Sequence, residues 1–343
     1  EFTMSGLTIQ SVTNLDPQVQ GDLLWAGALG GTKVVGICYN DSSLAKHTGF
    51  SPLCRINYFE LTGAQICIAS IQDIVNNGAN NVVARIVDGC LNTGNAVAAD
   101  IKVLLEGPYQ GAGMMDDALR TASLVPGAEP YTTLGFTQTG GGGEVLGAGV
   151  LDVVGNNAIV DWVLVELRNA QSPAQVVATR CGLLQRDGDI VSVDGMGSLI
   201  LPAVPGSYHV AVRHRNHFGV MTASPVVLSG SSTAIDFTQT GTATWGTDAR
   251  KNFGGGLWGL WSGNTRRDGN ISLLKYTGGN NDRDPILVIV GSSTPTAIVA
   301  GYSSEDANLN GVVKYTGNGN DRDPILVNVG SILPNGIRTE QLP

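Results

Sequence analysis

The stretch AIVDWVLVELR at residues 158–168 predicts a β-strand at the centre of a sheet. Successive side chains of a strand point to opposite faces. One face would carry Ile159, Val163, Val165 and Leu167, and the other Val160, Trp162 and Leu164. A strand that is apolar on both faces is covered on both sides. We therefore expect this strand to be central and its sheet to be covered by loops or by a neighbouring domain.

Shorter apolar runs surround this strand and are separated by Gly, Asn, Asp and Pro turns. They occupy residues 101–107, 176–185, 198–204, 207–215 and 233–241. Several short strands at this spacing are typical of a β-sandwich. The sequence therefore predicts a β-sandwich over residues 98–245.

A second set of strand-like runs lies in residues 1–97. These runs cover 7–12, 21–28, 32–40, 54–61 and 80–88, and 70–77 reads as a turn or a short helical piece. The pattern predicts another β-sandwich, which we assign to 1–97. Residues 246–262, rich in Gly and Trp, would connect residues 98–245 to a third region, so that 246–343 forms a small C-terminal module.

The composition agrees with a mainly β chain. The 343 residues include 47 glycines, charged residues are 14%, and the net charge is −9. An acidic chain without clustered Lys and Arg is a poor nucleic-acid binder. No apolar run approaches the roughly 20 residues of a membrane span. The chain starts at Glu1 without a signal-peptide pattern, so we expect a processed or truncated product.

Four of the five cysteines lie in the first 90 residues, at Cys38, Cys54, Cys67 and Cys90, with Cys181 alone. This clustering favours disulfides and an oxidising compartment. The expected pairs are Cys38 with Cys54 and Cys67 with Cys90, and four buried free thiols are the alternative. Zinc is disfavoured because no CxxC spacing occurs.

Two nearly identical phrases follow residue 262: KYTGGNNDRDPILVIVG at 275–291 and KYTGNGNDRDPILVNVG at 314–330. The sequence before the second phrase, DANLNGVV, has the spacing of an EF-hand-type calcium loop. Such loops place oxygen ligands at positions 1, 3 and 5, a glycine at 6 and a backbone carbonyl at 7. The predicted ligands are Asp306, Asn308, Asn310 and the carbonyl of Val312.

The first phrase has a poorer loop. Its ligands would be Asn264, Asp268 and Asn270, with Gly269 at the turn. Arg266 falls at position 3, where a cation cannot bind calcium, so this site should be weaker or use a water molecule.

Neither loop has an acid at position 12, but NDRDP follows in both copies. If the loops are lengthened, Asp321 and Asp323 can close the second site, and Asp282 and Asp284 the first. Asp before Pro also predicts a helix start, with Asp284 and Asp323 as N-caps. Each copy would thus be a loop and a short helix, and two such units would depend on Ca²⁺ for stability. A metal-free loop rich in Asx turns is the alternative.

Other polar clusters give weaker signals. His209, His214 and His217 would not share a face of one strand, so we expect a polar strand end or a glycan-contacting surface. The acids of QRDGDIVSVDG (185–195) favour a hairpin turn, with calcium binding as an alternative. No nucleophile-elbow, zinc-protease, phosphate-loop or dinucleotide-binding motif occurs.

These patterns resemble known secreted proteins. The order GLTIQSV, GDLLWA, KVVGICYND and CRINYFEL resembles the second half of a cohesin-like β-sandwich, and the loop–helix pair resembles a dockerin-like calcium repeat. Phrases from residue 101 onward look like a module near the C-termini of secreted Bacteroidota-type proteins. The resemblance implies an extracellular location and no catalytic role.

We therefore expect a non-catalytic, extracellular or cell-surface structural protein with about two Ca²⁺ sites. The cohesin-like pattern lacks its first strands, and open sheet edges invite pairing with another chain. The expected partners are copies of itself, in a filament or surface layer, with strand complementation as one route to assembly. A small domain that is complete without further strands, or one that was shortened, is the alternative. The alternative is a glycan-binding or docking module of a larger secreted protein, using Trp258 and Trp261 or a cohesin-like partner.

Overall fold

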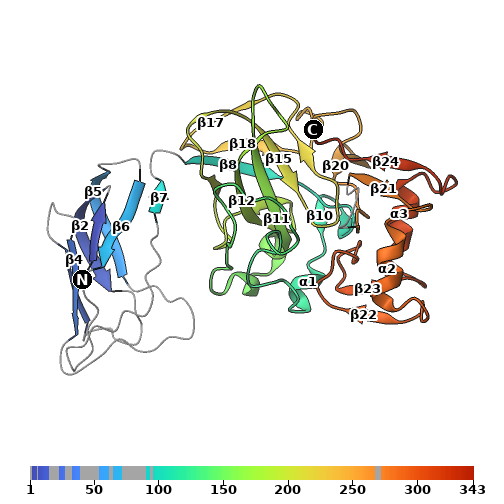
Figure 1. The fold of residues 1–343 in the computed structure, drawn as a ribbon, viewed down its shortest axis with the longest axis horizontal. Helices are drawn as coiled ribbons and strands as arrows, with labels where there is room; N and C mark the ends of the chain where they lie inside the picture. Colours follow the sequence, from blue (N-terminus) through green and yellow to red (C-terminus); the bar gives the residue numbers. More distant parts are fainter. Residues whose placement is uncertain are drawn as a thin grey trace. The chain divides into compact units, whose positions relative to one another are not determined.

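The computed structural model describes strands at 2–5, 7–14, 23–27, 33–38, 54–61, 65–71 and 90–92, and then residues 96–266 and 272–343. The mainly β class expected from the sequence is confirmed. The chain divides into two compact units, Glu1–Asn95 and Ala96–Pro343 (Figure 1). Residues 246–343, expected to form a module of their own, belong to the same compact unit as residues 98–245. In the described residues, no helix is long and apolar enough to cross a membrane.

The N-terminal unit contains two antiparallel sheets. A five-stranded sheet has the order β3-β4-β1-β6-β7, and a two-stranded sheet pairs β2 with β5. The bounds are β1 Phe2–Ser5, β2 Leu7–Asn14, β3 Leu23–Gly27, β4 Lys33–Cys38, β5 Cys54–Leu61, β6 Gln65–Ile71 and β7 Cys90–Asn92. Four of the expected strands match β2 to β5. β1, β6 and β7 were not foreseen, and the last two residues of β6, Ser70 and Ile71, were expected in a turn or a short helical piece. The expected strand at 80–88 lies outside the described residues.

The register of this unit bears on the cysteines. Cys67 of β6 lies directly opposite Cys90 of β7. Cys38 faces Leu23 in one sheet, whereas Cys54 faces Asn14 in the other. No disulfide is present among the side chains that the structure describes, and those of these four cysteines are outside that set. Their pairing stays a prediction, and the register supports only the Cys67–Cys90 pair.

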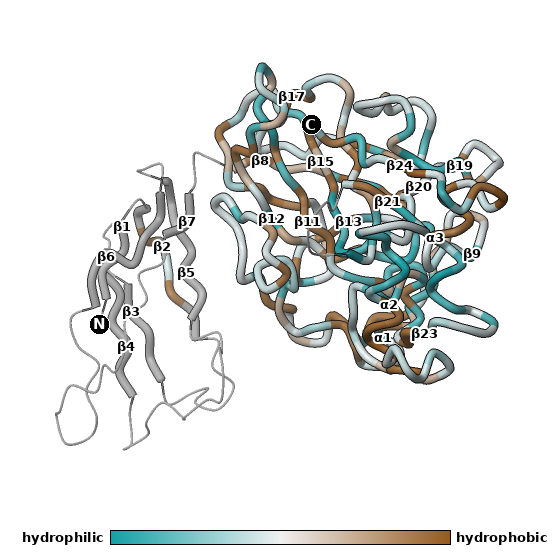
Figure 2. The backbone as a smooth tube through the Cα atoms, turned by 45° about the vertical axis from the view of Figure 1, so that its right-hand side comes forward, coloured by the Kyte–Doolittle hydropathy of each residue, from teal (hydrophilic) through white to brown (hydrophobic). Residues whose placement is uncertain are grey.

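The second unit is built on a nine-stranded sheet of order β14-β8-β13-β12-β11-β15-β16, with β17 paired to β15 and β18 parallel to β8. The sequence predicted a sandwich of two packed sheets, whereas these strands form one hydrogen-bonded sheet. The bounds are β8 Val97–Lys102, β11 Ile159–Asn169, β12 Val176–Gln185, β13 Asp189–Val191, β14 Leu199–Leu201, β15 Gly206–Arg213, β16 Val220–Met221, β17 Val226–Leu228 and β18 Thr233–Asp236. Figure 2 shows hydrophobic stretches along β8, β11 and β15.

The predicted central strand is confirmed. β11 pairs with β12 on one side and β15 on the other, and its residues 159–168 are all buried. The segment between β8 and β11 contributes to the cover: Tyr131 donates to the Trp162 carbonyl at 2.8 Å, and Trp162 Nε1 donates to the Pro126 carbonyl at 2.9 Å. Its short elements are β9 Tyr109–Gly111, β10 Met114–Met115, α1 Ala118–Thr121 and the 3-10 turns Val150–Asp152 and Gly155–Asn157.

The two C-terminal repeats exchange strands. Each has a strand, a helix and a second strand, and equivalent residues lie 39 apart, as do Lys275 and Lys314. The first strand of each repeat pairs with the last strand of the other, β21 with β24 and β22 with β23. The bounds are β21 Leu273–Lys275, α2 Arg283–Val290, β22 Ile298–Ala300, β23 Val312–Lys314, α3 Arg322–Asn328 and β24 Ile337–Thr339. Neither repeat therefore forms a hairpin from its own strands.

A second hydrophobic cluster fills the space between the repeats. It contains Phe218, which belongs to the part of the second unit that forms the large sheet and its loops (residues 96–262, the sheet unit). The cluster also contains three pairs of equivalent repeat residues: Leu274 with Val313, Ile286 with Ile325 and Val290 with Val329. The connector, which contains β19 Lys251–Gly254 and β20 Leu257–Gly259, leads into this region. The repeats thus share one core, and the large sheet contributes to it.

The helix starts differ from the expectation. α2 and α3 begin at Arg283 and Arg322, so each Pro is the third helical residue and not the first. The N-cap residues are Asp282 and Asp321, whose side chains make no capping hydrogen bond, and the asparagine before each provides it instead. Asn320 Oδ1 accepts from Asp323 N–H at 3.0 Å, and Asn320 Nδ2 donates back to the Asp323 carboxylate at 2.8 Å. Asn281 and Asp284 make the same pair of bonds. The predicted N-caps Asp284 and Asp323 were wrong, because an asparagine can both donate and accept and so satisfies the helix start reciprocally.

Candidate metal centre

The loop before β23 folds its side-chain oxygens onto its own backbone. Asp306 is fully buried and accepts from the N–H groups of Asn310 at 3.1 Å and Gly311 at 2.8 Å. Asn308 Oδ1 accepts from Asn310 N–H at 3.1 Å, and Asn310 Oδ1 from Val312 N–H at 2.9 Å. Gly311 has a φ of +82°, which glycine adopts without strain. The predicted positions 1, 3, 5 and 6 therefore form one turn.

Asp321 approaches this turn from the N-terminus of α3. It is fully buried, and its carboxylate accepts from Lys314 N–H at 2.7 Å and more weakly from Asn308 N–H at 3.4 Å. Asn308 is position 3 of the loop, so Asp321 stands where a lengthened loop needs its closing acid. The structure brings Asp306 and Asp321 together from positions 15 residues apart in the sequence.

The two carboxylates are unfavourable neighbours in the protein alone. Burial raises the pKa of Asp306 to about 6, and the Arg215 guanidinium only partly offsets it. Burial raises the pKa of Asp321 to about 7, and the charge on Asp306 adds to the shift. A cation between them would favour the ionised form of both carboxyls.

Asp323, also expected as a ligand, does not join this pair. Its side chain is 61% exposed and is held by Asn320, as described above. Asp284 is in the same position in the first repeat and is 52% exposed. The second Asp of each NDRDP phrase thus belongs to the helix cap, and only the first Asp faces the loop.

The first repeat reproduces the closing half of the site. Asp282 is buried and accepts from Arg266 N–H at 3.2 Å and Lys275 N–H at 2.8 Å, as Asp321 does from Asn308 and Lys314. Arg266 thus takes the place of Asn308, and Asn264, two residues earlier, takes that of Asp306. Asp268 and Asn270 lie outside the described residues. Because Arg266 offers no side-chain oxygen, this copy has fewer ligands.

The donor set of the second loop suits calcium. It consists of two buried carboxylates, the amide oxygens of Asn308 and Asn310, and backbone carbonyls that include Val312. Hard divalent cations such as Ca²⁺ take six to eight oxygen ligands of these kinds. The site contains no sulfur or imidazole, which zinc and copper favour. The residues therefore fit Ca²⁺, and fit it better in the second copy than in the first.

A different acidic cluster was not foreseen. Glu129, Glu144 and Cys181 are buried with their ligand atoms within 4.8 Å of one another. Their oxygens are already used: Glu129 accepts from Gly143 N–H at 3.1 Å and bonds Thr132, and Glu144 pairs with Arg180 at 3.3 Å. Burial raises the pKa of the Cys181 thiol far above its usual value, so it stays protonated. The three residues lie up to 52 positions apart, so no local pattern announces them.

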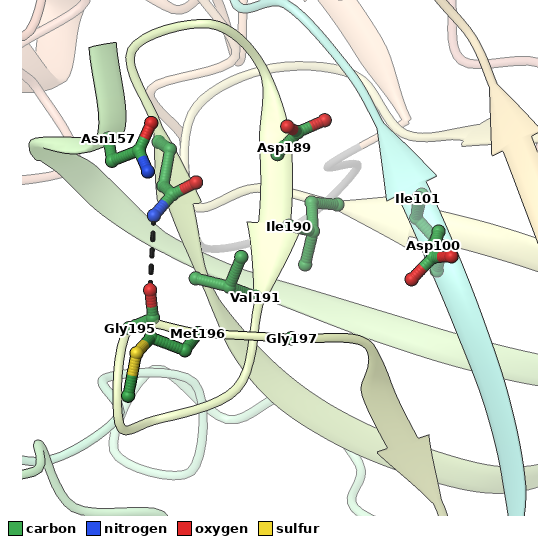
Figure 3. A pocket seen from close by; sticks show the side chains of 10 residues that line it. Asp100, Ile101, Asn157, Asp189, Ile190, Val191, Gly195, Met196 and Gly197 are labelled. Atoms are coloured by element: carbon green, nitrogen blue, oxygen red, sulfur yellow. Dashed lines mark hydrogen bonds between the residues drawn. The ribbon is translucent and has the colours of Figure 1, made fainter. Parts of the chain in front are cut away.

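A cavity of about 350 Å³ lies elsewhere, against the large sheet (Figure 3). A hydrogen bond from Gln185 Nε2 to the Gly195 carbonyl, at 3.2 Å, links two of its walls. Of the acids in the 185–195 hairpin, Asp189 lines it and pairs with Lys102 at 3.1 Å. Asp194 instead accepts from Met196 N–H at 3.0 Å. Asp187 accepts from Asp189 N–H at 3.3 Å, so Asp187 and Asp194 each bond the backbone two residues ahead, as in a turn.

The histidines are buried, so the expected surface role was wrong. His214 Nε2 bonds the Asp161 carboxylate at 3.0 Å, Arg215 pairs with the same carboxylate, and Tyr302 donates to it at 2.7 Å. Burial would raise the pKa of Asp161, but the Arg215 guanidinium and the hydrogen bonds from His214 and Tyr302 hold it below its usual value. The side chains of Asp161, His214 and Arg215 are fully enclosed, so solvent does not reach them.

Comparison with known proteins provides no identification. No family model, no curated protein and no solved structure matches this chain. The function must therefore be argued from the site itself.

Proposed function

We propose that this chain is a non-catalytic, calcium-stabilised structural protein of the cell exterior. The observation that carries the proposal is the convergence of Asp306 and Asp321 in a loop with calcium-ligand spacing. Burying two carboxylates side by side is costly unless a cation pairs with them. A structural ion in a loop closed by two segments contributes its binding energy to folding.

Self-assembly is the second part of the proposal. Within the described strands, β2 and β5 pair with each other and with nothing else, which leaves an edge of each strand for a partner. The repeats also expose equivalent apolar side chains, Val288 and Val327 on the helices and Ile298 and Ile337 on the last strands. Open edges and exposed apolar side chains both support contacts with further copies of the chain.

The glycan-binding alternative has less support. Trp258 and Trp261 are half-buried, with Arg250 over the first ring and Arg338 and Lys251 over the second. Trp261 Nε1 also donates to the Asp248 carbonyl at 3.0 Å. Rings covered by cationic side chains present little free face for stacking on a sugar.

Calorimetric titration of chelator-stripped protein with Ca²⁺ tests the first part. We expect one tight site and one weaker site, and Mg²⁺ should bind less tightly because it demands six close ligands. Asp321→Asn should abolish the tight site, whereas Asp323→Asn, a matched change two residues away, should leave it intact. Absence of Ca²⁺ binding by the wild type would reject the proposal.

Electron microscopy of concentrated protein before and after EGTA tests the second part. Ordered polymers that loosen on chelation would tie the contacts to the repeats. Polymers indifferent to EGTA would point to the N-terminal unit and strand complementation. A chain that stays monomeric with calcium present would contradict self-assembly.

A further inference from the structure

A single buried asparagine of the large-sheet unit contacts both metal loops. Asn216 lies in the turn after β15 and has no exposed surface. Its Nδ2 donates to the carbonyl of Asp306 at 2.6 Å and to that of Ser304 at 3.1 Å. Asp306 is position 1 of the second loop.

The backbone of Asn216 reaches the first loop. Its carbonyl accepts from Gly263 N–H at 3.1 Å and from Asn264 N–H at 3.0 Å. Asn264 is position 1 of the first loop. The same residue therefore fixes the first position of both loops, with its side chain on one and its main chain on the other.

The orientation of the Asn216 amide is set by its neighbour. His217 Nε2 accepts from Gly107 N–H at 3.0 Å, so in the neutral ring the proton sits on Nδ1. Burial lowers the pKa of His217 well below its usual value, which keeps the ring neutral. His217 Nδ1 then donates to Asn216 Oδ1 at 2.8 Å, and Nδ2 is left facing the two loop carbonyls. The amide cannot flip without losing all three bonds.

Further contacts seat the second loop on the sheet unit. Ser262 donates to the Ala307 carbonyl at 2.5 Å. Leu309 is buried in the main hydrophobic core, next to the residues of the sheet. Gly107 lies so close to Ala307 that any side chain there would overlap the loop carbonyl. Residues of the large sheet and its loops therefore shape one side of this loop.

We propose that Asn216 is a positioning residue for both calcium sites, and that it couples them to each other and to the large sheet. This inference rests on the proposed calcium function. A bond to the position 1 carbonyl fixes where the position 1 side chain points, and groups that orient metal ligands in this way affect affinity about 10- to 100-fold. The sheet unit, and not the repeats alone, would then set the affinity of both loops.

Calorimetric titration of the stripped full-length chain with Ca²⁺ tests this. In Asn216→Asp the shape is kept, but a carboxylate faces the two loop carbonyls. We expect the tight site to weaken by about tenfold or more. The weaker site should change less, because Asn216 holds the first loop through its main chain, which the substitution keeps. Ser262→Ala removes one donor to the second loop only, so the tight site should weaken several-fold and the weaker site should not change.

Val212→Ala is the matched control, because Val212 is fully buried in β15 and loses core contacts without touching a loop. Urea unfolding in EGTA should show a comparable loss of stability, and calcium affinity should stay at the wild-type value. If Asn216→Asp loses stability like this control but binds calcium like the wild type, Asn216 is merely structural and the inference is wrong.

The outcomes separate the two proposals. A wild type that binds no calcium rejects the proposed function itself. If Asn216→Asp does not fold, Ser262→Ala decides: an unchanged tight site would overturn the inference, and a selective loss at that site would support it.

Discussion

Removal of calcium should make this protein sensitive to pH in a defined direction. In the metal-free protein, burial raises the pKa of Asp306 from 3.8 to about 6 and that of Asp321 from 3.8 to about 7. A carboxyl whose pKa is higher in the folded state than in the unfolded state binds its proton more tightly when folded. Its contribution to stability is then complete below pH 3.8 and is lost as the pH rises through the folded pKa. Calcium should reverse the trend, because it binds the ionised pair.

The size of the effect follows from the pKa values. One pKa unit corresponds to about 1.4 kcal/mol, so ionising Asp306 in the folded metal-free chain costs about 3 kcal/mol. Asp321 adds to this, but each carboxylate shifts the other, so the two values do not simply sum. About 1.4 kcal/mol of the Asp306 contribution is lost between pH 5 and pH 8, because the rest is lost below pH 5, where the unfolded carboxyl ionises first. For a unit of this size 1 kcal/mol moves Tm by about 2–4 °C, so Asp306 alone should lower the Tm of metal-free protein by at least about 3 °C over this range, and Asp321 adds to the loss.

The assay is thermal unfolding of chelator-stripped protein, with and without excess Ca²⁺, followed by calorimetry. Stripped protein is preferable to EGTA, because EGTA binds calcium weakly in acid. His217 works in the opposite direction: burial lowers its pKa, so its contribution grows as the pH rises through 6.5. This contribution is the same with and without calcium, so the difference between the two Tm values removes it.

That difference should be small near pH 5 and should widen toward pH 8. Asp321→Asn should flatten it, and Asp323→Asn should not alter it, because Asp323 is exposed and caps a helix. A difference that stays constant over this range, or that shrinks with rising pH, would refute the reasoning that Asp306 and Asp321 share a cation.

Three further experiments test the packing. Gly107→Ala should destabilise the second unit by about 1–3 kcal/mol in urea, because the methyl overlaps the Ala307 carbonyl, whereas Gly127→Ala, with open space around it, should be nearly neutral. Cys181 should resist alkylation at pH 8 in the native protein, as judged by mass spectrometry of its peptide, and should react once the chain is unfolded, because burial raises its pKa. Deleting residues 337–343 removes β24, the partner of β21, and should lower the Tm of the first repeat as well as the second; loss confined to the second repeat would contradict strand exchange.

The sequence predicted the parts of the site that are local in the chain. Asp306, Asn308 and Asn310 follow a fixed spacing, and a turn of this kind places its oxygens by its own hydrogen bonds. The repeat was also visible, because KYTG and NDRDPILV recur almost unchanged. The last strands were missed for the opposite reason: Ile298–Ala300 and Ile337–Thr339 occupy equivalent positions but share only their first residue.

The histidines show where the alternation of side chains between the two faces of a strand no longer applies. His209 lies within β15, which ends at Arg213. The chain turns into the protein after Arg213, so the alternation of side chains between two faces does not extend to His214 and His217. Both are buried, and not on the surface where that alternation placed them. Contacts such as that of Asn216 with Asp306 join residues 90 apart, and no spacing rule in the sequence can reveal them.

The charge around the second loop bears on which ion the proposed site would take. Arg215 is paired with Asp161, so these two buried charges cancel. His214 accepts from the Asn216 N–H and His217 from the Gly107 N–H, so both rings are neutral. Two negative charges then remain, on Asp306 and Asp321. A monovalent ion would leave one of them uncompensated in a buried site, whereas a divalent ion neutralises both. Metal-free protein can reach the same balance only by binding two protons, which is why proton and calcium binding should compete at this loop.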